Sequence, residues 1–221
     1  MYRKPLTVLD SRLTLRKKSS PFPPPSEMSD QDRSEIQDLQ DTFNVLEGYG
    51  LALPQLGILK RGVIINFSAL GLPDMSTSEV MINPELEAWG EDQRNEEACF
   101  SVPHISAFVR RPYSCRVKYI DLQGALKTIE LEGFPAACLQ HEIDHLDGTL
   151  YIDKAGRVYA GMLLKKCFKA EKKLQKEKEA ARLEFENEHR ELMGFTKTKT
   201  TSTRKRASKK RKKRPNRSKK K

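Results

Sequence analysis

Residues 140–148, QHEIDHLDG, contain two histidines four positions apart, with a glutamate directly after the first. An α-helix has about 3.6 residues per turn, so this spacing places His141 and His145 on one face, one turn apart. Both rings can then reach a single metal ion at about 2.0–2.1 Å, with Glu142 beside any water on that ion. Two of the chain's four histidines lie in this window. The pattern predicts a metal-hydrolase helix, and a chance arrangement of surface histidines accounts for it poorly.

Such a helix favours hydrolysis of a carbonyl compound. A divalent cation lowers the pKa of a bound water toward neutrality, and a neighbouring glutamate can take up the proton and return it. Hydrolytic metal sites usually have three protein ligands and leave the fourth position to water. One ligand is therefore still needed besides the two histidines.

The sequence offers two candidates for this third ligand. Downstream, the only histidine is His189, in the charged helical stretch NEHRELM, where an exposed helix face is the simpler interpretation. Upstream, residues 95–103, NEEACFSVP, contain Cys99, whose thiolate suits iron or zinc. Further upstream, residues 48–55 read GYGLALPQ.

The three blocks, in this order, resemble the peptide deformylase family, whose pattern reads approximately GxGLAAPQ, EGCLS and QHExDHLxG. The resemblance extends over roughly residues 5–155 and includes MINPELE before the cysteine block. It implies a hydrolase that removes the formyl group from the N-terminal formyl-methionine of newly synthesised polypeptides and releases formate. It also implies one divalent metal ion as cofactor, Fe²⁺ in the first place and Zn²⁺ as the alternative.

Carried over position by position, the resemblance implies three metal ligands: Cys99, His141 and His145. Glu142 becomes the general acid and base. The side-chain amide of Gln55 and the backbone N–H of Phe100 become the two donors that stabilise the developing oxyanion. Loss of one such donor typically costs about 2.7–4 kcal/mol of transition-state stabilisation.

The resemblance also outlines the substrate site. It places eight residues there: Gly48, Tyr49, Gly50, Glu97, Ala98, Phe134, Ala137 and Cys138. The two glycines suit a loop along which the substrate backbone passes closely, because glycine has no Cβ, and an ordinary turn is the alternative interpretation. Phe134 and Ala137, expected near the methionine side chain, also fit plain core packing in the approach to the metal helix.

Four positions depart from the family pattern, and one of them, Leu53 in place of an alanine, is expected to change only packing. Ala98 stands where the family has glycine, and its Cβ could crowd an extended peptide. Phe100 replaces a leucine, which keeps the backbone donor but changes the wall beside the metal. Ser106 stands where the family often has arginine, so the preference for residues beyond methionine stays open. Two alternatives accompany the main prediction: a catalytically weakened deformylase-like protein that binds ribosomal RNA, and a metallopeptidase that uses the same helix.

The basic charge is concentrated near the C-terminus. The chain has 41 Lys and Arg against 30 Asp and Glu, but 15 of the basic residues and no acid lie in residues 197–221. Such a run cannot bury apolar surface, is expected to be disordered, and binds polyanions by counterion release. We expect a catalytic domain in residues 1–155, a charged C-terminal helix in 156–195 and a disordered basic tail in 196–221. The resemblance to bacterial deformylases implies that this helix docks on the ribosome.

The composition also bears on location. An apolar run of about 18 residues is absent, and the first residues lack the layout of a secretory signal, so no membrane partner is expected. The four cysteines lie far apart without a CxxC pair, which indicates a reducing compartment. We expect the cytoplasm of a bacterial-type cell, with an organelle matrix as the alternative.

The residue patterns predict an α+β fold, with antiparallel β-sheets packed around a central metal-binding helix and an additional C-terminal helix. Ser29 is expected to begin a helix with an apolar stripe that runs to Leu46. Residues 5–16 look like a short strand and turn. Short β-type runs follow between residues 57 and 131: GVIINF, EVMIN, AFVRR, CRVKYI and KTIELE. The metal helix is expected from Pro135, and another helix over residues 157–193.

Overall fold

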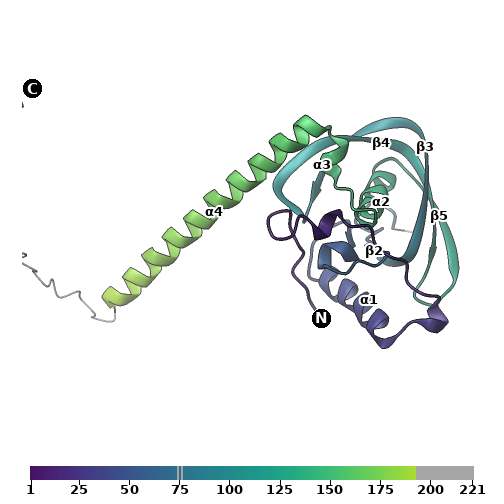
Figure 1. The fold of residues 1–221 in the computed structure, drawn as a ribbon, viewed down its shortest axis with the longest axis horizontal. Helices are drawn as coiled ribbons and strands as arrows, with labels where there is room; N and C mark the ends of the chain where they lie inside the picture. The colour runs from purple at the N-terminus through teal and green to yellow at the C-terminus, as the bar shows by residue number, and fades with distance from the viewer. Residues whose placement is uncertain (74, 76, 193–221) are drawn as a thin grey trace, which may run out of the picture. The chain divides into compact units, whose positions relative to one another are not determined.

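The structure is a computed structural model that describes residues 1–73, 75 and 77–192 (Figure 1). Its helices are α1 (Asp30–Phe43), α2 (Gly133–Leu146), α3 (Tyr151–Lys154) and α4 (Arg157–Leu192). Its strands are β1 (Gly50–Ala52), β2 (Gly62–Ile65), β3 (Glu79–Cys99), β4 (Val102–Ile120) and β5 (Leu126–Glu132). Three short 3-10 helices lie at Thr14–Arg16, Pro25–Glu27 and Leu53–Leu56. This mixture confirms the predicted α+β class.

The five strands form one antiparallel sheet in the order β1-β2-β3-β4-β5. In Figure 1 the strands β3, β4 and β5 curve around α2. One face of α2 packs into the core through residues at helical spacing: Ala136, Leu139, Ile143 and Leu146. They meet buried sheet residues such as Met81, Val117 and Leu131. The predicted central helix, surrounded by antiparallel strands, is therefore confirmed.

The β3–β4 hairpin is much longer than the sequence runs indicated. The predicted run EVMIN is only the start of β3, which has 21 residues, and the runs AFVRR and CRVKYI are parts of β4, which has 19. The ladder shifts register between Trp89 and Asp92, where Gly90 has φ +91°, and again between Ala98 and Cys99. Most of β3 beyond residue 84 is exposed on both faces, so the apolar alternation that marks a strand is missing there.

Helix α1 begins where the sequence predicted it. The backbone N–H of Asp32 donates to the Ser29 hydroxyl (3.2 Å), and the N–H of Ser29 donates to the Asp32 carboxylate (2.9 Å), which forms a capping box. The helix ends at Phe43 and does not continue to Leu46.

The expected strand in residues 5–16 was wrong. This segment forms turns and the first 3-10 helix. It is attached by two backbone hydrogen bonds, from Leu6 N–H to the Gln55 carbonyl (2.6 Å) and from Val8 N–H to the Ser101 carbonyl (2.8 Å). Two such bonds position the segment without building a ladder.

The chain divides into a compact unit, Met1–Lys176, and a second unit that begins at Glu177. Helix α4 starts inside the first unit, where Ala160, Leu163, Leu164 and Cys167 are buried in its core. The predicted domain boundary at residue 155 stays a prediction, and the predicted basic tail lies outside the described residues. None of the described helices is long and apolar enough to cross a membrane.

Candidate metal centre and active-site pocket

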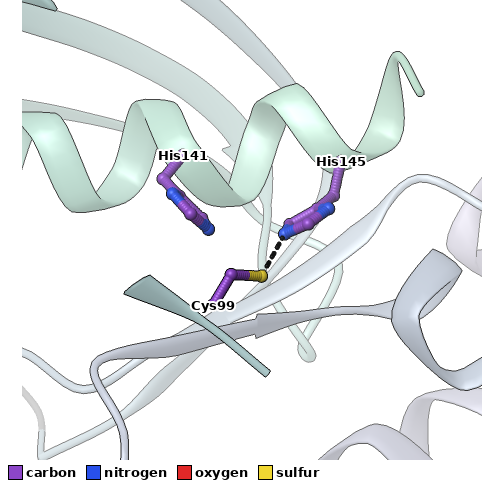
Figure 2. A group of neighbouring side chains, drawn as sticks. All are labelled: Cys99, His141 and His145. Atoms are coloured by element: carbon purple, nitrogen blue, oxygen red, sulfur yellow. Dashed lines mark hydrogen bonds between the residues drawn. The ribbon is translucent and has the colours of Figure 1, made fainter. Parts of the chain in front are cut away.

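The structure brings Cys99, His141 and His145 together. Their donor atoms all lie within 4.8 Å of one another. In Figure 2 both histidine rings project from α2 toward Cys99 at the end of β3, and a dashed line joins the Cys99 Sγ to the Nε2 of His145 (3.2 Å). The cluster can supply one sulfur and two nitrogens to a single ion. Because both histidines are buried, this ion would be shielded from bulk water.

The backbone around Cys99 holds its sulfur in place. The strand β3 ends at this residue, and the N–H of Ser101 in the following turn donates to the Cys99 Sγ (3.4 Å). The carbonyl of Ser101 in turn accepts the N–H of Val8. The N-terminal segment therefore supports the turn that carries the candidate sulfur ligand.

A buried charge network surrounds the first histidine. The Nδ1 of His141 lies 2.7 Å from a carboxylate oxygen of Glu97. Arg111 donates two hydrogen bonds to Glu97 (2.5 and 2.9 Å) and one to Asp144 (2.7 Å). Burial raises the pKa of Glu97, but the hydrogen bonds from Arg111 and His141 outweigh it and lower that pKa to about 2. Glu97 is therefore ionised and orients His141 so that its Nε2 faces the cluster.

Glu142 has the opposite environment. Its side chain is buried, and its Oε2 is among the buried polar atoms of the described chain that have no hydrogen-bond partner. Burial raises the pKa of Glu142 to about 7, although His141 and Arg111 lower it. Gly50 lies directly against this side chain, because a Cβ there would come within 2.6 Å of the Glu142 Cγ. A carboxyl group tuned close to neutrality can both accept and return a proton.

Gln55 has a defined amide orientation. Its Oε1 accepts the backbone N–H of Ala52 (2.8 Å), so its NH₂ group must point the other way. That group lies 3.4 Å from the Cys99 Sγ and 3.3 Å from the Ser101 Oγ. The side chain is 1% exposed, so a fixed donor is directed toward the candidate metal cluster.

A pocket of about 760 Å³ opens beside this cluster. Its lining includes all eight residues expected at the substrate site, together with Gln55, Phe100, Cys99, His141 and Glu142. Tyr49 and Phe134 meet edge to face with ring centroids 5.2 Å apart, which gives the pocket an aromatic side. Gly48 lies against the Phe100 ring, because a Cβ on this glycine would approach that ring to 3.0 Å.

Two residues of the site were missed from the sequence. Arg111 was assigned no role, although it continues the buried positions of Ala107 and Val109 at a spacing of two. That alternation was the available signal. Tyr151 carried no such signal, yet its ring stacks on His141 at 5.8 Å and its hydroxyl donates to the Ile105 carbonyl (2.8 Å).

His189, the other candidate ligand, lies on α4 and stacks on Phe185 at a centroid distance of 6.0 Å. It does not belong to the cluster of potential metal ligands found among the described residues.

Comparison with known proteins gives consistent matches. A sequence model of the family described as Polypeptide deformylase matches residues 4–159. The peptide deformylase of Agrobacterium fabrum is 40% identical over 134 residues, which cover 60% of this chain and 78% of that protein. The peptide deformylase of Mesorhizobium japonicum is 38% identical over 181 residues, which cover 81% of this chain and 97% of that protein.

Solved structures agree with the sequence matches. A crystal structure of a peptide deformylase from Legionella pneumophila superimposes with a TM-score of 0.68 at 34% identity, covering 79% of this chain and 98% of that one. A Met-Ala-Ser-bound peptide deformylase from Acinetobacter baumannii matches with a TM-score of 0.60 at 30% identity, covering 70% of this chain and 98% of that one.

Proposed function

The chain belongs to the polypeptide deformylase family, and from this premise we propose that Cys99, His141 and His145 hold the metal ion on which its hydrolysis depends. The enzymes of this family remove the formyl group from an N-terminal formyl-methionine and release formate, and the chain is a hydrolase of this kind. The proposal depends on one observation: the potential ligand atoms of these three residues all lie within 4.8 Å of one another.

The donor set fits a divalent transition metal. One thiolate and two imidazoles are the soft and intermediate ligands that suit iron and zinc, whereas magnesium and calcium prefer oxygen. We propose Fe²⁺ as the native ion and Zn²⁺ as the alternative. Metal analysis of protein purified without oxygen tests this choice, because a stoichiometric content of any other metal contradicts both.

Different residues of the chain have different roles in the proposed reaction. The metal ion, when bound, acts as a Lewis acid toward the formyl carbonyl and lowers the pKa of a water. Glu142 takes the proton of the attacking water and delivers it to the departing amine nitrogen. The Gln55 amide and the Phe100 backbone N–H donate to the oxygen of the formyl group as negative charge develops there. The fixed orientation of Gln55 supports this role, because the donor need not reorganise during the reaction.

The pocket supports a methionine-terminated peptide as substrate. Tyr49, Phe134, Ala137 and Cys138 provide an apolar wall for the methionine side chain beside the metal cluster. Glu97 also belongs to the proposed surroundings of the methionine side chain, and Gly48, Gly50 and Ala98 lie along the proposed path of the peptide backbone. The Met-Ala-Ser ligand named for the Acinetobacter baumannii enzyme is a peptide of this type.

The C-terminal helix supports a proposal of docking on ribosomal RNA in the cytoplasm. Six exposed lysines lie on the first part of α4: Lys165, Lys166, Lys169, Lys172, Lys173 and Lys176. Because phosphate contacts release counterions, binding to ribosomes should weaken steeply as salt rises. Cosedimentation with ribosomes at 50 and 200 mM salt tests this, and binding that does not change with salt contradicts it.

Formate release from formyl-Met-Ala-Ser by anaerobically metallated protein tests the activity. The reaction should release one formate per peptide and leave the peptide bonds intact, whereas a metallopeptidase would cleave inside the chain. The weakened-enzyme alternative depends on Ala98, whose side chain is exposed in the pocket lining. Ala98→Gly should change kcat/KM by less than about fivefold, and a gain of about a hundredfold or more would favour that alternative.

A further inference from the structure

One wall of the pocket lies outside the regular β-ladder. The register shift between Ala98 and Cys99 leaves three residues of β4 without a partner on β3, between two paired positions. These residues are Pro103, His104 and Ile105, and all three line the pocket. A segment that the ladder skips has to be held by other contacts. We call it the 103–105 bulge.

Those contacts come from the helices that follow α2 along the chain. The Cys167 thiol of α4 donates to the Pro103 carbonyl (3.2 Å), and the Tyr151 hydroxyl of α3 donates to the Ile105 carbonyl (2.8 Å). Between them, the Nε2 of His104 lies 2.8 Å from the Glu171 Oε2 on α4. A carboxylate only accepts hydrogen bonds, so His104 donates this one. Each residue of the bulge therefore has one bond to α3 or α4.

His104 also has a backbone conformation that needs support. Its φ of +68° lies in the left-handed region, which is unfavourable for a residue with a Cβ. Such conformations persist where surrounding contacts over-determine them, and they concentrate at functional sites. The side chain of His104 is 31% exposed and that of Glu171 is 28% exposed, so burial alone does not explain the pairing.

We propose that His104 is a positioning residue for the peptide substrate, which it serves by fixing the 103–105 bulge against α4 through Glu171. The first turns of α4 thus belong to the substrate-binding apparatus. The proposal rests on the assigned role of the pocket in binding formylated peptides. It concerns the wall that the substrate meets beyond the metal cluster, so it predicts a change in KM and not in the chemical step.

Glu171 is the residue to change, because Tyr151 also stacks on His141 and its removal would disturb the metal cluster. Glu171→Ala removes the acceptor, whereas Glu171→Gln keeps one. The matched control is Gln175→Ala, which removes the neighbouring side chain that donates to the other oxygen of Glu171 (3.1 Å). His104→Asn tests the same pair from the other side, because Asn tolerates a positive φ but is too short to keep the contact.

With formyl-Met-Ala-Ser, Glu171→Ala should raise KM about three- to tenfold, while kcat stays within about twofold and metal content is unchanged. Glu171→Gln should recover part of the loss, and Gln175→Ala should behave as wild type. The double variant Glu171→Ala/His104→Asn should be no worse than either single variant, because both remove the same contact.

An unchanged KM in Glu171→Ala and His104→Asn, whether or not the melting temperature falls, overturns the proposal. The proposal is also overturned if the free-energy costs calculated from KM of the two single variants add up in the double variant. Failure of the proposed function would look different, because wild type itself would then release no formate. In that case calorimetric binding of the product peptide Met-Ala-Ser still compares the variants.

Discussion

Two arginines five residues apart on β4 carry the same charge in opposite surroundings. Arg111 has a side chain that is 1% exposed and bonds to Glu97 and Asp144, whereas the Arg116 side chain is 40% exposed and pairs with Glu87 and Glu130. An exposed pair is solvated in either state and contributes little. A buried pair that loses one partner leaves a charge without compensation. Removal of an arginine therefore has different consequences for stability in the buried interior and at the exposed surface.

The largest expected effect is on the reaction rate and concerns Glu142, a buried carboxyl group that has no hydrogen bond from Arg111. Glu142→Gln removes the proton acceptor and should lower kcat about 10²- to 10⁴-fold while metal content is retained. Because the wild-type group is buried with an oxygen lacking a partner, its neutral isostere should not lower the free energy of unfolding. Steady-state kinetics and urea unfolding measure the two effects. Near-normal kcat in a metallated variant would remove Glu142 from the mechanism.

Arg111→Met should produce the largest loss of stability. It leaves the buried Glu97 without its arginine, while Asp144 is partly exposed and keeps its ion pair with Lys154. The loss at Glu97 should lower the free energy of unfolding by about 3–5 kcal/mol. It also loosens the carboxylate that orients His141, so metal affinity should fall about 10- to 100-fold. Urea unfolding and competition with a chelator measure the two effects. If Arg111→Met unfolds like wild type, the comparison between the two arginines fails.

The ion pair between Asp32 and Lys60 is intermediate in burial between the pairs of Arg111 and those of Arg116. The Asp32 side chain is 6% exposed and pairs with Lys60, which is 28% exposed. Hydrogen bonds from Lys60 and Ser29 lower the pKa of Asp32 from 3.8 to about 2. A carboxyl group with a lowered pKa in the folded state stabilises the protein above pH 3.8, and this contribution is lost as the pH falls toward 2.

Asp32→Asn should therefore flatten the decline of stability between pH 4 and 2, and should cost about 1 kcal/mol at pH 7 through the capping box. Thermal unfolding across this pH range measures it. The exposed Asp30→Asn in the same helical turn is the control. An unchanged pH profile in Asp32→Asn would contradict the lowered pKa.

The smallest effect is expected at Arg116. Arg116→Met repeats the Arg111 substitution on the solvent side and should shift the melting temperature by less than about 2 °C. Raising the salt concentration should reduce even this difference, because exposed charges are screened. A loss as large as that of Arg111→Met would show that burial does not separate the two sites.

The residue patterns predicted the parts of the site that depend on local spacing. The two histidines lie on one face of α2 because their four-residue separation matches the helical repeat, and Ser29 begins α1 through a bond three residues away. The resemblance to a family supplied Cys99, which spacing alone left open against His189. The long hairpin was underestimated because its exposed middle lacks an apolar alternation.

The amino-acid sequence by itself determined the family, the metal helix and the residues available as ligands, because these depend on motifs and on contacts within a few residues. Only the tertiary structure decided that the Cys99 sulfur lies 3.2 Å from a ring 46 residues later, and that Arg111 is buried between two carboxylates. The same holds for the support of the 103–105 bulge by α3 and α4. Contacts between distant segments depend on strand register and helix packing, which local patterns do not specify.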